Sequence, residues 1–308
     1  GARAMSNDKL VQDASVPVSE QPTRQSALYD RVAEQTASMI IREYSTSFGM
    51  AARLLGAGVR QDVENIYGLV RLADEIVDGV AAYAGVSEKE IRRLLDELEE
   101  ETEAAMKRGY STNLVVHAFA LTARRTGIEP DLTRPFFTSM RVDITRVTHT
   151  PKSFDDYVYG SAEVVGLMCL KAFLVGKDLT PEENDTFVTG ARKLGAAFQK
   201  VNFLRDLSAD VDALGRSYFP GINIATFTEE QKMILVADIH SDLAISGAIV
   251  PLLPFSSRKA VALAQNLFAE LNRRIERTPA AELKHTRVSV PTLVKLRIAL
   301  AVLMGKTS

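Results

Sequence analysis

The chain of 308 residues contains a single cysteine, Cys169, and therefore cannot form an internal disulfide bond. This composition is typical of proteins that work in a reducing compartment. Cys169 lies in an apolar run, where a free cysteine usually serves as a small core residue. Histidine is also scarce, and the four histidines lack the spacing of a zinc site. The sequence thus contains neither a disulfide scaffold nor a zinc motif.

Several motifs of nucleotide binding and hydrolysis are missing as well. The sequence has no glycine-rich phosphate loop, no G-x-S-x-G nucleophile elbow and no dinucleotide-binding fingerprint. The last absence argues against a step that consumes NADPH. The net charge of −2 gives no general reason to expect a nucleic acid partner.

Long hydrophobic runs are also absent. No apolar run reaches about 18 residues, so the sequence predicts no membrane-spanning segment. The stretch 293–304 is apolar but contains Lys295 and Arg297, and we expect a terminal packing helix there, with contact to a membrane surface as the alternative. The expected location is cytoplasmic, with that alternative placing the protein at the inner membrane face. Residues 1–4 precede Met5 and are interpreted as a remnant of expression.

Helical periodicity is what the sequence does contain. From Tyr29 onward, apolar residues recur at intervals of three and four, and no alternating strand pattern is present. Residues 1–27 are predicted to be a disordered tail. Residues 28–308 are predicted to form one all-α domain of about ten helices around a central cavity. The expected helices include residues 59–84, 132–147, 153–175 and 181–210.

Two clusters of carboxylates lie about 130 residues apart, each beside an arginine. Their sequences are R-L-A-D-E-I-V-D (71–78) and N-F-L-R-D-L-S-A-D (202–210). Each contains two aspartates four residues apart, which should project from one face of a helix. Apolar neighbours indicate that these faces are buried, so a cation should lie between the carboxylates. Oxygen ligands of this kind favour Mg²⁺ or Mn²⁺ held together with substrate phosphates. We expect the two acidic helices to face each other across the cavity.

Three further segments combine small, polar and aromatic residues. Y-S-T-S-F (44–48) carries hydroxyl groups and an aromatic ring, and G-R-S-Y-F-P (215–220) follows the second acidic cluster as a loop. Y-G-S-A-E-V-V-G-L-M (159–168) places Gly160 and Gly166 inside a helix, where glycine costs about 1 kcal/mol relative to alanine. These glycines predict close helix packing or room for a ligand.

Taken in order, these segments resemble the squalene/phytoene synthase family over roughly residues 28–300. The segment 159–168 is similar to the form found in bacterial phytoene synthases. The resemblance implies an all-α isoprenoid synthase fold and a Mg²⁺-dependent prenyltransferase of carotenoid biosynthesis. The implied reaction is the head-to-head condensation of two molecules of geranylgeranyl diphosphate. It passes through a cyclopropyl diphosphate intermediate to phytoene and needs no NADPH.

The resemblance also assigns roles to individual residues. It implies the Mg²⁺ ligands Asp74, Asp78, Asn202, Asp206 and Asp210, of which the four aspartates are also catalytic. It implies that diphosphate is bound by Ser47, Tyr67, Arg71, Arg205 and Arg287. It implies that the reacting centre is lined by Phe48, Gln199 and two further catalytic residues, Tyr157 and Tyr218.

Three positions depart from the pattern of the family. Glu75 follows Asp74 where many relatives have a second aspartate, and its role as a ligand or as a supporting group stays open. Thr46 lies where relatives often carry a basic residue. Phe268 occupies what resembles a tyrosine position.

Three alternative functions remain. A squalene or dehydrosqualene synthase would use C15 farnesyl diphosphate in the same site and would differ in the depth of its cavity. A terpene cyclase also has aspartate-rich helices, but it usually carries Ser or Thr and then Glu where this chain has Asp206 and Asp210. A non-catalytic helical assembly factor is the alternative from a different class, and such a protein should have lost the acidic ligands. The sequence does not predict the oligomeric state.

Overall fold

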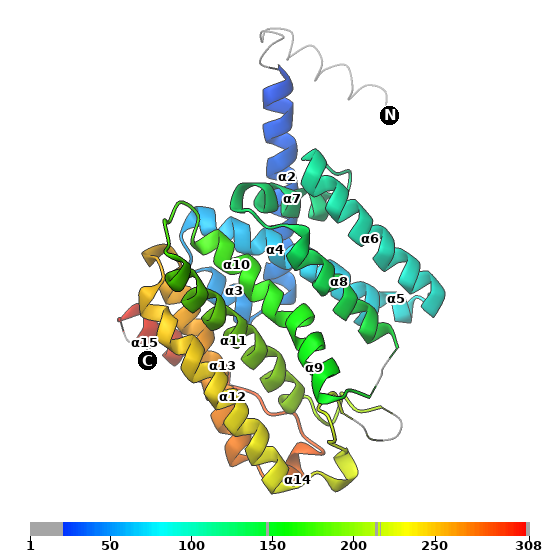
Figure 1. Cartoon of the computed structure of the whole chain (residues 1–308), viewed down its shortest axis with the longest axis vertical. Helices are drawn as coiled ribbons and strands as arrows, with labels where there is room; N and C mark the ends of the chain where they lie inside the picture. The colour runs from blue at the N-terminus through cyan, green and yellow to red at the C-terminus, as the bar shows by residue number, and fades with distance from the viewer. Residues whose placement is uncertain (1–20, 146–147, 213–214, 216, 306–308) are drawn as a thin grey trace.

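The computed structural model describes residues 21–145, 148–212, 215 and 217–305, and these residues form helices without any β-strand. This confirms the all-α class. Figure 1 shows an elongated bundle in which α11, α12 and α13 run side by side, while α4, α6, α7 and α8 gather at the other end. The helical elements are α2 (Gln21–Tyr44), α3 (Ser47–Ala52), α4 (Ala57–Asp78), α5 (Val80–Tyr83), α6 (Glu88–Arg108), α7 (Leu114–Thr126), α8 (Pro130–Ile144), α9 (Pro151–Val158), η2 (Tyr159–Glu163), α10 (Val164–Phe173), α11 (Pro181–Arg205), η3 (Ile224–Thr226), α12 (Glu229–Ile249), η4 (Val250–Leu252), α13 (Phe255–Arg277), α14 (Ala280–Leu283) and α15 (Thr292–Leu303).

Threonine caps start α9, α11 and α12. Thr150, Thr180 and Thr228 each accept a hydrogen bond from the backbone N–H three residues later, and the side chain of that residue bonds back to the cap. Such reciprocal bonds satisfy two backbone donors that a helix start leaves unpaired. The local sequence therefore fixes where α9, α11 and α12 begin.

Two large apolar clusters form the core. The first contains Phe119, Phe136 and Phe137 on α7 and α8, and Cys169 packs at its edge as the predicted small core residue. The second joins α9, α11, α12 and α13 and includes Tyr157 and Phe203. The candidate site residues on α9 and α11 therefore rest on packed core.

Several helix ends differ from the prediction. The helix expected over 59–84 stops at Asp78, and a separate short helix, α5, follows Gly79. The helix expected over 181–210 ends at Arg205, and the one expected over 132–147 ends at Ile144. Of the tail expected over 1–27, residues 1–20 lie outside the described residues, and α2 begins at Gln21.

The helix expected over 153–175 is interrupted by a π-helical turn, η2, at Tyr159–Glu163. Single π-helical turns inside α-helices are frequent at functional sites. The glycine of this turn, Gly160, lies against α8, where an added Cβ would collide with the carbonyl oxygen of Pro135. Gly166 lies against α11, where a Cβ would come within 2.7 Å of the Ala191 carbonyl oxygen. The prediction of close helix packing at both glycines is confirmed.

Within the described ranges, one helical stretch, Glu229–Leu252, is long and apolar enough to cross a membrane by length and composition. It spans α12 and η4, and α12 packs against both α11 and α13. Ile239 and Leu243 of this helix belong to the second core cluster. We therefore interpret α12 as a core helix.

Candidate active site

The first acidic cluster occupies the last two turns of α4. The Arg71 guanidinium lies 3.4 Å from the carboxylate of Asp74, and it also pairs with Glu75. The same guanidinium stacks on the ring of Tyr44, 4.3 Å from the ring centroid. Burial lowers the pKa of Arg71, but these carboxylates outweigh burial and raise it overall. Arg71 therefore stays charged, held between an aromatic face and two carboxylates.

One atom of Arg71 has no partner. Its Nε is buried and makes no hydrogen bond within the described part of the chain. A buried donor without an acceptor costs about 1–3 kcal/mol. An anion that reaches this atom would remove that cost, so the position of Nε fits a ligand phosphate.

The two aspartates of the first cluster are less buried than predicted. Asp74 is half-buried and Asp78, the last residue of α4, is exposed, because the helix ends where the core ends. Burial raises the pKa of Asp74, and its carboxyl group hydrogen-bonds the side chain of Asp78. Two carboxyl groups in contact need a shared proton or a cation between them. The donor set at this end of α4 therefore fits a divalent cation.

The second acidic cluster begins on the last turns of α11 and continues beyond its end. Asp206 is the C-cap of α11, and the backbone N–H of Asp210 donates to the Asp206 carbonyl oxygen at 2.9 Å. The prediction that Asp206 and Asp210 project from one helix face is therefore wrong, because α11 ends at Arg205, before both residues. A single α-type turn still links the two residues, and Asn202 lies one turn earlier on α11.

Asp206 is held by two arginines. The Arg205 guanidinium grips its carboxylate in two bonds, of 3.1 and 2.8 Å, and Arg287 donates to it at 2.7 Å. Leu207, buried to 1% exposure, anchors this turn in the core. Among the described residues, no three His, Cys, Asp or Glu side chains form a ready-made metal cluster. The magnesium assignment stays a prediction.

Tyr157 connects the two clusters. Its side chain is 4% exposed, and its ring packs between His149, Phe203 and Tyr218, with centroid distances of 5.2, 6.0 and 5.6 Å. Burial raises the pKa of Tyr157 well above its usual value, and the charges of Asp143 and Asp78 add to the effect. The end of α4 therefore lies within electrostatic reach of a ring that packs on α11.

Asp143 orients the two tyrosines. The hydroxyl of Tyr157 donates to its carboxylate at 2.8 Å, and the hydroxyl of Tyr218 donates at 3.2 Å. The Tyr218 ring stacks flat on Phe203, with 4.2 Å between centroids and 2° between planes. Residue 218 reaches this position through the loop that follows the second cluster, which turns at Gly215 with φ of +80°. The result is a fixed aromatic wall of Tyr157, Phe203 and Tyr218.

A second aromatic group surrounds Phe48 on α3. Its ring lies 4.8 Å from Phe198 of α11, 6.3 Å from Tyr67 of α4 and 6.2 Å from Phe268 of α13. Phe268, the departure from the family pattern, is buried in the second core cluster. Burial raises the pKa of Tyr67, which keeps its phenol protonated. Phe48 therefore joins α3 to α4 and α11, which carry predicted site residues, and to α13.

The remaining predicted residues are tied to neighbouring elements. Gln199 on α11 donates to the hydroxyl of Ser161 in η2 at 2.9 Å. Lys295 on α15 reaches the hydroxyl of Ser47 at 3.4 Å. Thr46 is exposed and lines a separate surface cavity on the outer side of α3.

Sequence reasoning missed Asp143, Tyr44 and Lys295 as members of the site. Asp143 is a lone acidic residue whose partner lies 14 positions away, so no helical spacing marks it. Lys295 meets Ser47 across 248 positions. Only Tyr44 carried a signal, because it opens the Y-S-T-S-F segment.

The profile of the family described as squalene/phytoene synthase matches residues 41–294. The chain belongs to the squalene/phytoene synthase family. It is 30% identical over 190 residues to the 15-cis-phytoene synthase of a Paracoccus strain, and the aligned region covers 60% of this chain and 59% of that protein. It is 28% identical over 235 residues to the phytoene synthase of Arthrospira platensis, which covers 73% of this chain and 72% of that protein.

Solved structures of family members share the fold. A dehydrosqualene synthase with bound ligand superposes with a TM-score of 0.72 at 22% identity, covering 90% of this chain and 97% of that chain. The squalene synthase of Alicyclobacillus acidocaldarius superposes with a TM-score of 0.69 at 18% identity, covering 81% of this chain and 95% of that chain. These likenesses establish the isoprenoid synthase fold.

Proposed function

We propose that this chain condenses two molecules of geranylgeranyl diphosphate head-to-head to phytoene, through a cyclopropyl diphosphate intermediate. The observation that carries the proposal is the set of contacts around Tyr157, which bring the end of α4 and the last turns of α11 to one aromatic wall. Relatives named phytoene synthase, at 28–30% identity, support the C20 substrate.

The arginines and hydroxyls around the clusters would bind the diphosphate groups. Arg71 offers its unpartnered Nε, and Arg205 and Arg287 can turn from Asp206 toward a phosphate. Ser47, with Lys295 beside it, and the protonated phenol of Tyr67 add donors on α3 and α4. Planar guanidinium groups suit phosphate oxygens because they bind in pairs of hydrogen bonds.

Asp74, Asp78, Asn202, Asp206 and Asp210 would hold Mg²⁺, which would supply positive charge to the departing diphosphate. The contact between Asp74 and Asp78 supports this assignment, because it brings two carboxyl groups together. Glu75 pairs with Arg71, which favours a role for Glu75 as a supporting group that positions Arg71.

The aromatic residues would protect and stabilise the carbocation. The π faces of Phe48, Tyr157 and Tyr218 can attract positive charge, and Tyr157, at 4% exposure, is shielded from water. Asp143 would keep the Tyr157 and Tyr218 rings in fixed positions through their hydroxyl groups.

Purified protein incubated with Mg²⁺ and geranylgeranyl diphosphate, followed by analysis of the extracted hydrocarbon, tests the proposal. Asp78→Ala and Asp206→Ala should each abolish product while the helical circular dichroism stays intact. The matched control is Asp156→Ala, which removes an exposed carboxylate paired with Lys152 on α9. Substantial turnover in either site variant would contradict the two-cluster assignment.

A C30 synthase that uses farnesyl diphosphate is the alternative, favoured by the dehydrosqualene and squalene synthases among the structures with the same fold. The residues named above would serve both reactions, because the two substrates differ in chain length and share the diphosphate group.

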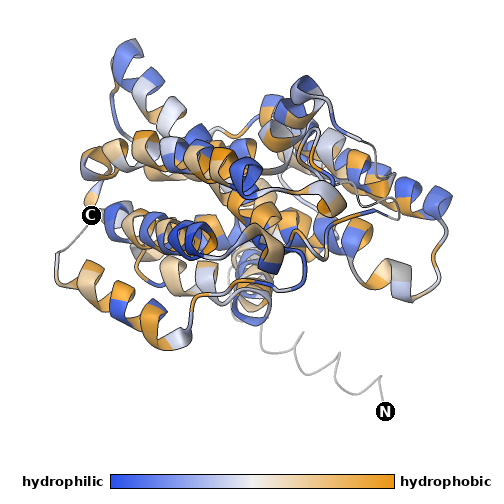
Figure 2. Cartoon of the chain, turned by 90° about the horizontal axis from the view of Figure 1, so that it is seen from below, coloured by the Kyte–Doolittle hydropathy of each residue, from blue (hydrophilic) through white to orange (hydrophobic). Residues whose placement is uncertain are grey.

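We further propose that α15 contacts a membrane surface, where the substrate chains partition. Leu293, Leu296, Leu300 and Leu303 are each at least half exposed along this helix, and Figure 2 shows its hydrophobic residues beside the C-terminus. Arg297 on the same helix is exposed and could meet anionic headgroups.

A further inference from the structure

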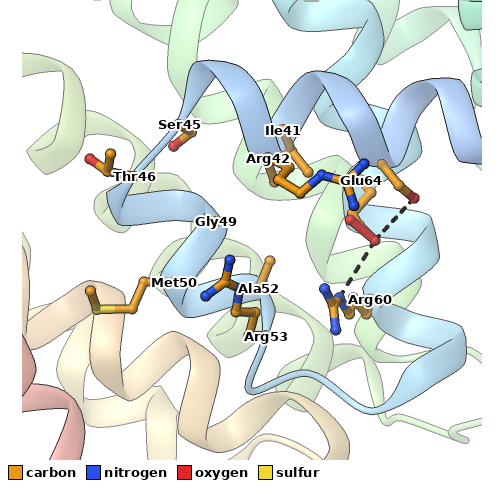
Figure 3. Close-up of a pocket in the computed structure, with 11 residues that line it drawn as sticks. Ile41, Arg42, Ser45, Thr46, Gly49, Met50, Ala52, Arg53, Arg60 and Glu64 are labelled. Atoms are coloured by element: carbon orange, nitrogen blue, oxygen red, sulfur yellow. Dashed lines mark hydrogen bonds and ion pairs between the residues drawn. The ribbon is translucent and has the colours of Figure 1, made fainter.

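A cavity of about 380 Å³ opens on the outer side of α3, between the end of α2 and the start of α4. Figure 3 shows the side chains of Arg42, Arg53 and Arg60 directed into this space, one from each of two helices and one from the turn that follows α3. None of the residues that line the cavity is among the candidate site residues. Residues 46, 49, 50 and 53 face the cavity at helical spacing, while Phe48 packs on the opposite side of α3 against Phe198.

The charges around the cavity are not balanced. Its lining holds three guanidinium groups and one carboxylate, that of Glu64. Glu64 is 5% exposed, and its Oε1 lies 3.5 Å from Arg60 and also accepts a hydrogen bond from the Ser38 hydroxyl at 3.3 Å. Neither Arg42 nor Arg53 has an ion pair with any residue that the structure describes. The cavity therefore carries an excess of two positive charges.

An excess of this size suits one class of ligand. A phosphate monoester carries a charge of about −1.5 to −2 at pH 7, and arginine binds its oxygens with pairs of parallel hydrogen bonds. The volume of about 380 Å³ admits a phosphate group together with a small part of the molecule that bears it.

We propose that this cavity is a binding site for a phosphate group, held mainly by Arg42 and Arg53 and separate from the proposed condensation site. The phosphate belongs either to a free phosphorylated molecule or to the headgroup of a phosphatidate in a membrane. The second source is within reach, because Met50 at the edge of the cavity packs against the apolar cluster that includes Val302 of α15.

The test measures binding of inorganic phosphate by titration calorimetry, in chloride buffer without Mg²⁺ and without prenyl substrate. The double variant Arg42→Gln/Arg53→Gln should weaken the affinity at least tenfold. Both side chains are exposed and lack ion pairs within the described residues, so the variant should keep its melting temperature. The matched control is Arg31→Gln, which removes an exposed arginine of α2, the helix that carries Arg42, at a position outside the cavity.

A second arm uses flotation with phosphatidylcholine vesicles that contain phosphatidate, compared with phosphatidylcholine alone. Phosphatidate-dependent binding that disappears in the double variant assigns the site to a lipid headgroup. Calorimetric binding of free phosphate without a phosphatidate effect assigns it to a soluble ligand. Equal affinity of wild type and double variant in both arms, or no binding in either, would overturn the proposal. Because neither arm measures catalysis, failure of the phosphate-site proposal can be distinguished from failure of the proposed condensation.

Discussion

At the scale of single residues, Arg205 has two roles that one substitution can separate. In the structure it pairs with Asp206, and in the proposed reaction it grips a diphosphate. Lysine keeps the charge but loses the planar, two-bond geometry. We expect Arg205→Lys to lower turnover about tenfold or more, which equals about 1.4 kcal/mol of transition-state stabilisation.

The melting temperature of Arg205→Lys should change little, because a partly exposed ion pair contributes only about 0–1 kcal/mol. Arg273→Lys, which alters an exposed pair with Glu270 on α13, is the control for the exchange itself. Full turnover together with a clearly lower melting temperature would show that Arg205 has only a structural role.

His149, which packs on the aromatic wall, should make the stability of the protein depend on pH. Its ring lies 5.2 Å from that of Tyr157, and burial lowers the pKa of His149 below the ordinary value of 6.5. Between the lowered pKa of the folded state and the ordinary pKa of the unfolded state, the unfolded chain binds more protons than the folded one. The free energy of unfolding therefore rises with pH through this window, and this stability is lost as the pH falls below about 6.5. Thermal unfolding at pH 7.5 and 5.5 measures the difference.

The variant His149→Gln should lose less stability over that pH range than the wild type. His240→Gln changes an exposed histidine on α12 and should leave the pH dependence unchanged. An unaltered slope in His149→Gln would mean that other groups carry the pH dependence.

At the scale of elements, the π-helical turn η2 depends on Gly160. A Cβ at this position would collide with the Pro135 carbonyl oxygen and the Ser139 hydroxyl of α8. Overpacking of this kind costs about 1–3 kcal/mol, so Gly160→Ala should lower the free energy of unfolding by that amount in urea denaturation. Gly58→Ala at the start of α4, where a Cβ meets nothing within 4 Å, is the control and should be neutral or stabilising.

The exposed face of α15 makes the membrane proposal testable. Leu296→Ser/Leu300→Ser removes two apolar side chains that are 52% and 58% exposed. Because binding to a bilayer surface scales with the apolar area inserted, flotation with anionic vesicles should fall several-fold. Leu28→Ser/Met39→Ser on α2 is the control, with side chains 51% and 55% exposed. Equal losses in both variants would exclude a specific role for α15.

Elements were predictable where the signal was local. Helical periodicity placed most helices, and the glycines of 159–168 predicted close packing. Helix ends near the site were missed because tertiary contacts decide them: α11 ends at Arg205, where Leu207 turns into the core. Asp143 was missed for the same reason, since only the folded chain brings it to Tyr157.

At the scale of the whole molecule, the arrangement of the site explains why substrate length is hard to read from sequence. The motifs contain the groups that we propose to bind diphosphate, and these groups would serve C15 and C20 substrates alike. The length of the prenyl substrate would depend instead on the depth of the space that the packed helices leave for its apolar tail. That depth is a joint property of many side chains on several helices, and no single motif encodes it.

The product therefore provides the decisive prediction at this scale. Offered C15 and C20 diphosphates together with Mg²⁺, the enzyme should prefer the C20 substrate and release phytoene. Its yield should not change when NADPH is added, because the sequence has no dinucleotide-binding fingerprint and the proposed last step is loss of a proton. The control is the same mixture with Asp206→Ala, which should release no hydrocarbon from either substrate. A main product of C30, or a reduced product that forms only with NADPH, would place the enzyme with the squalene-type members of the family.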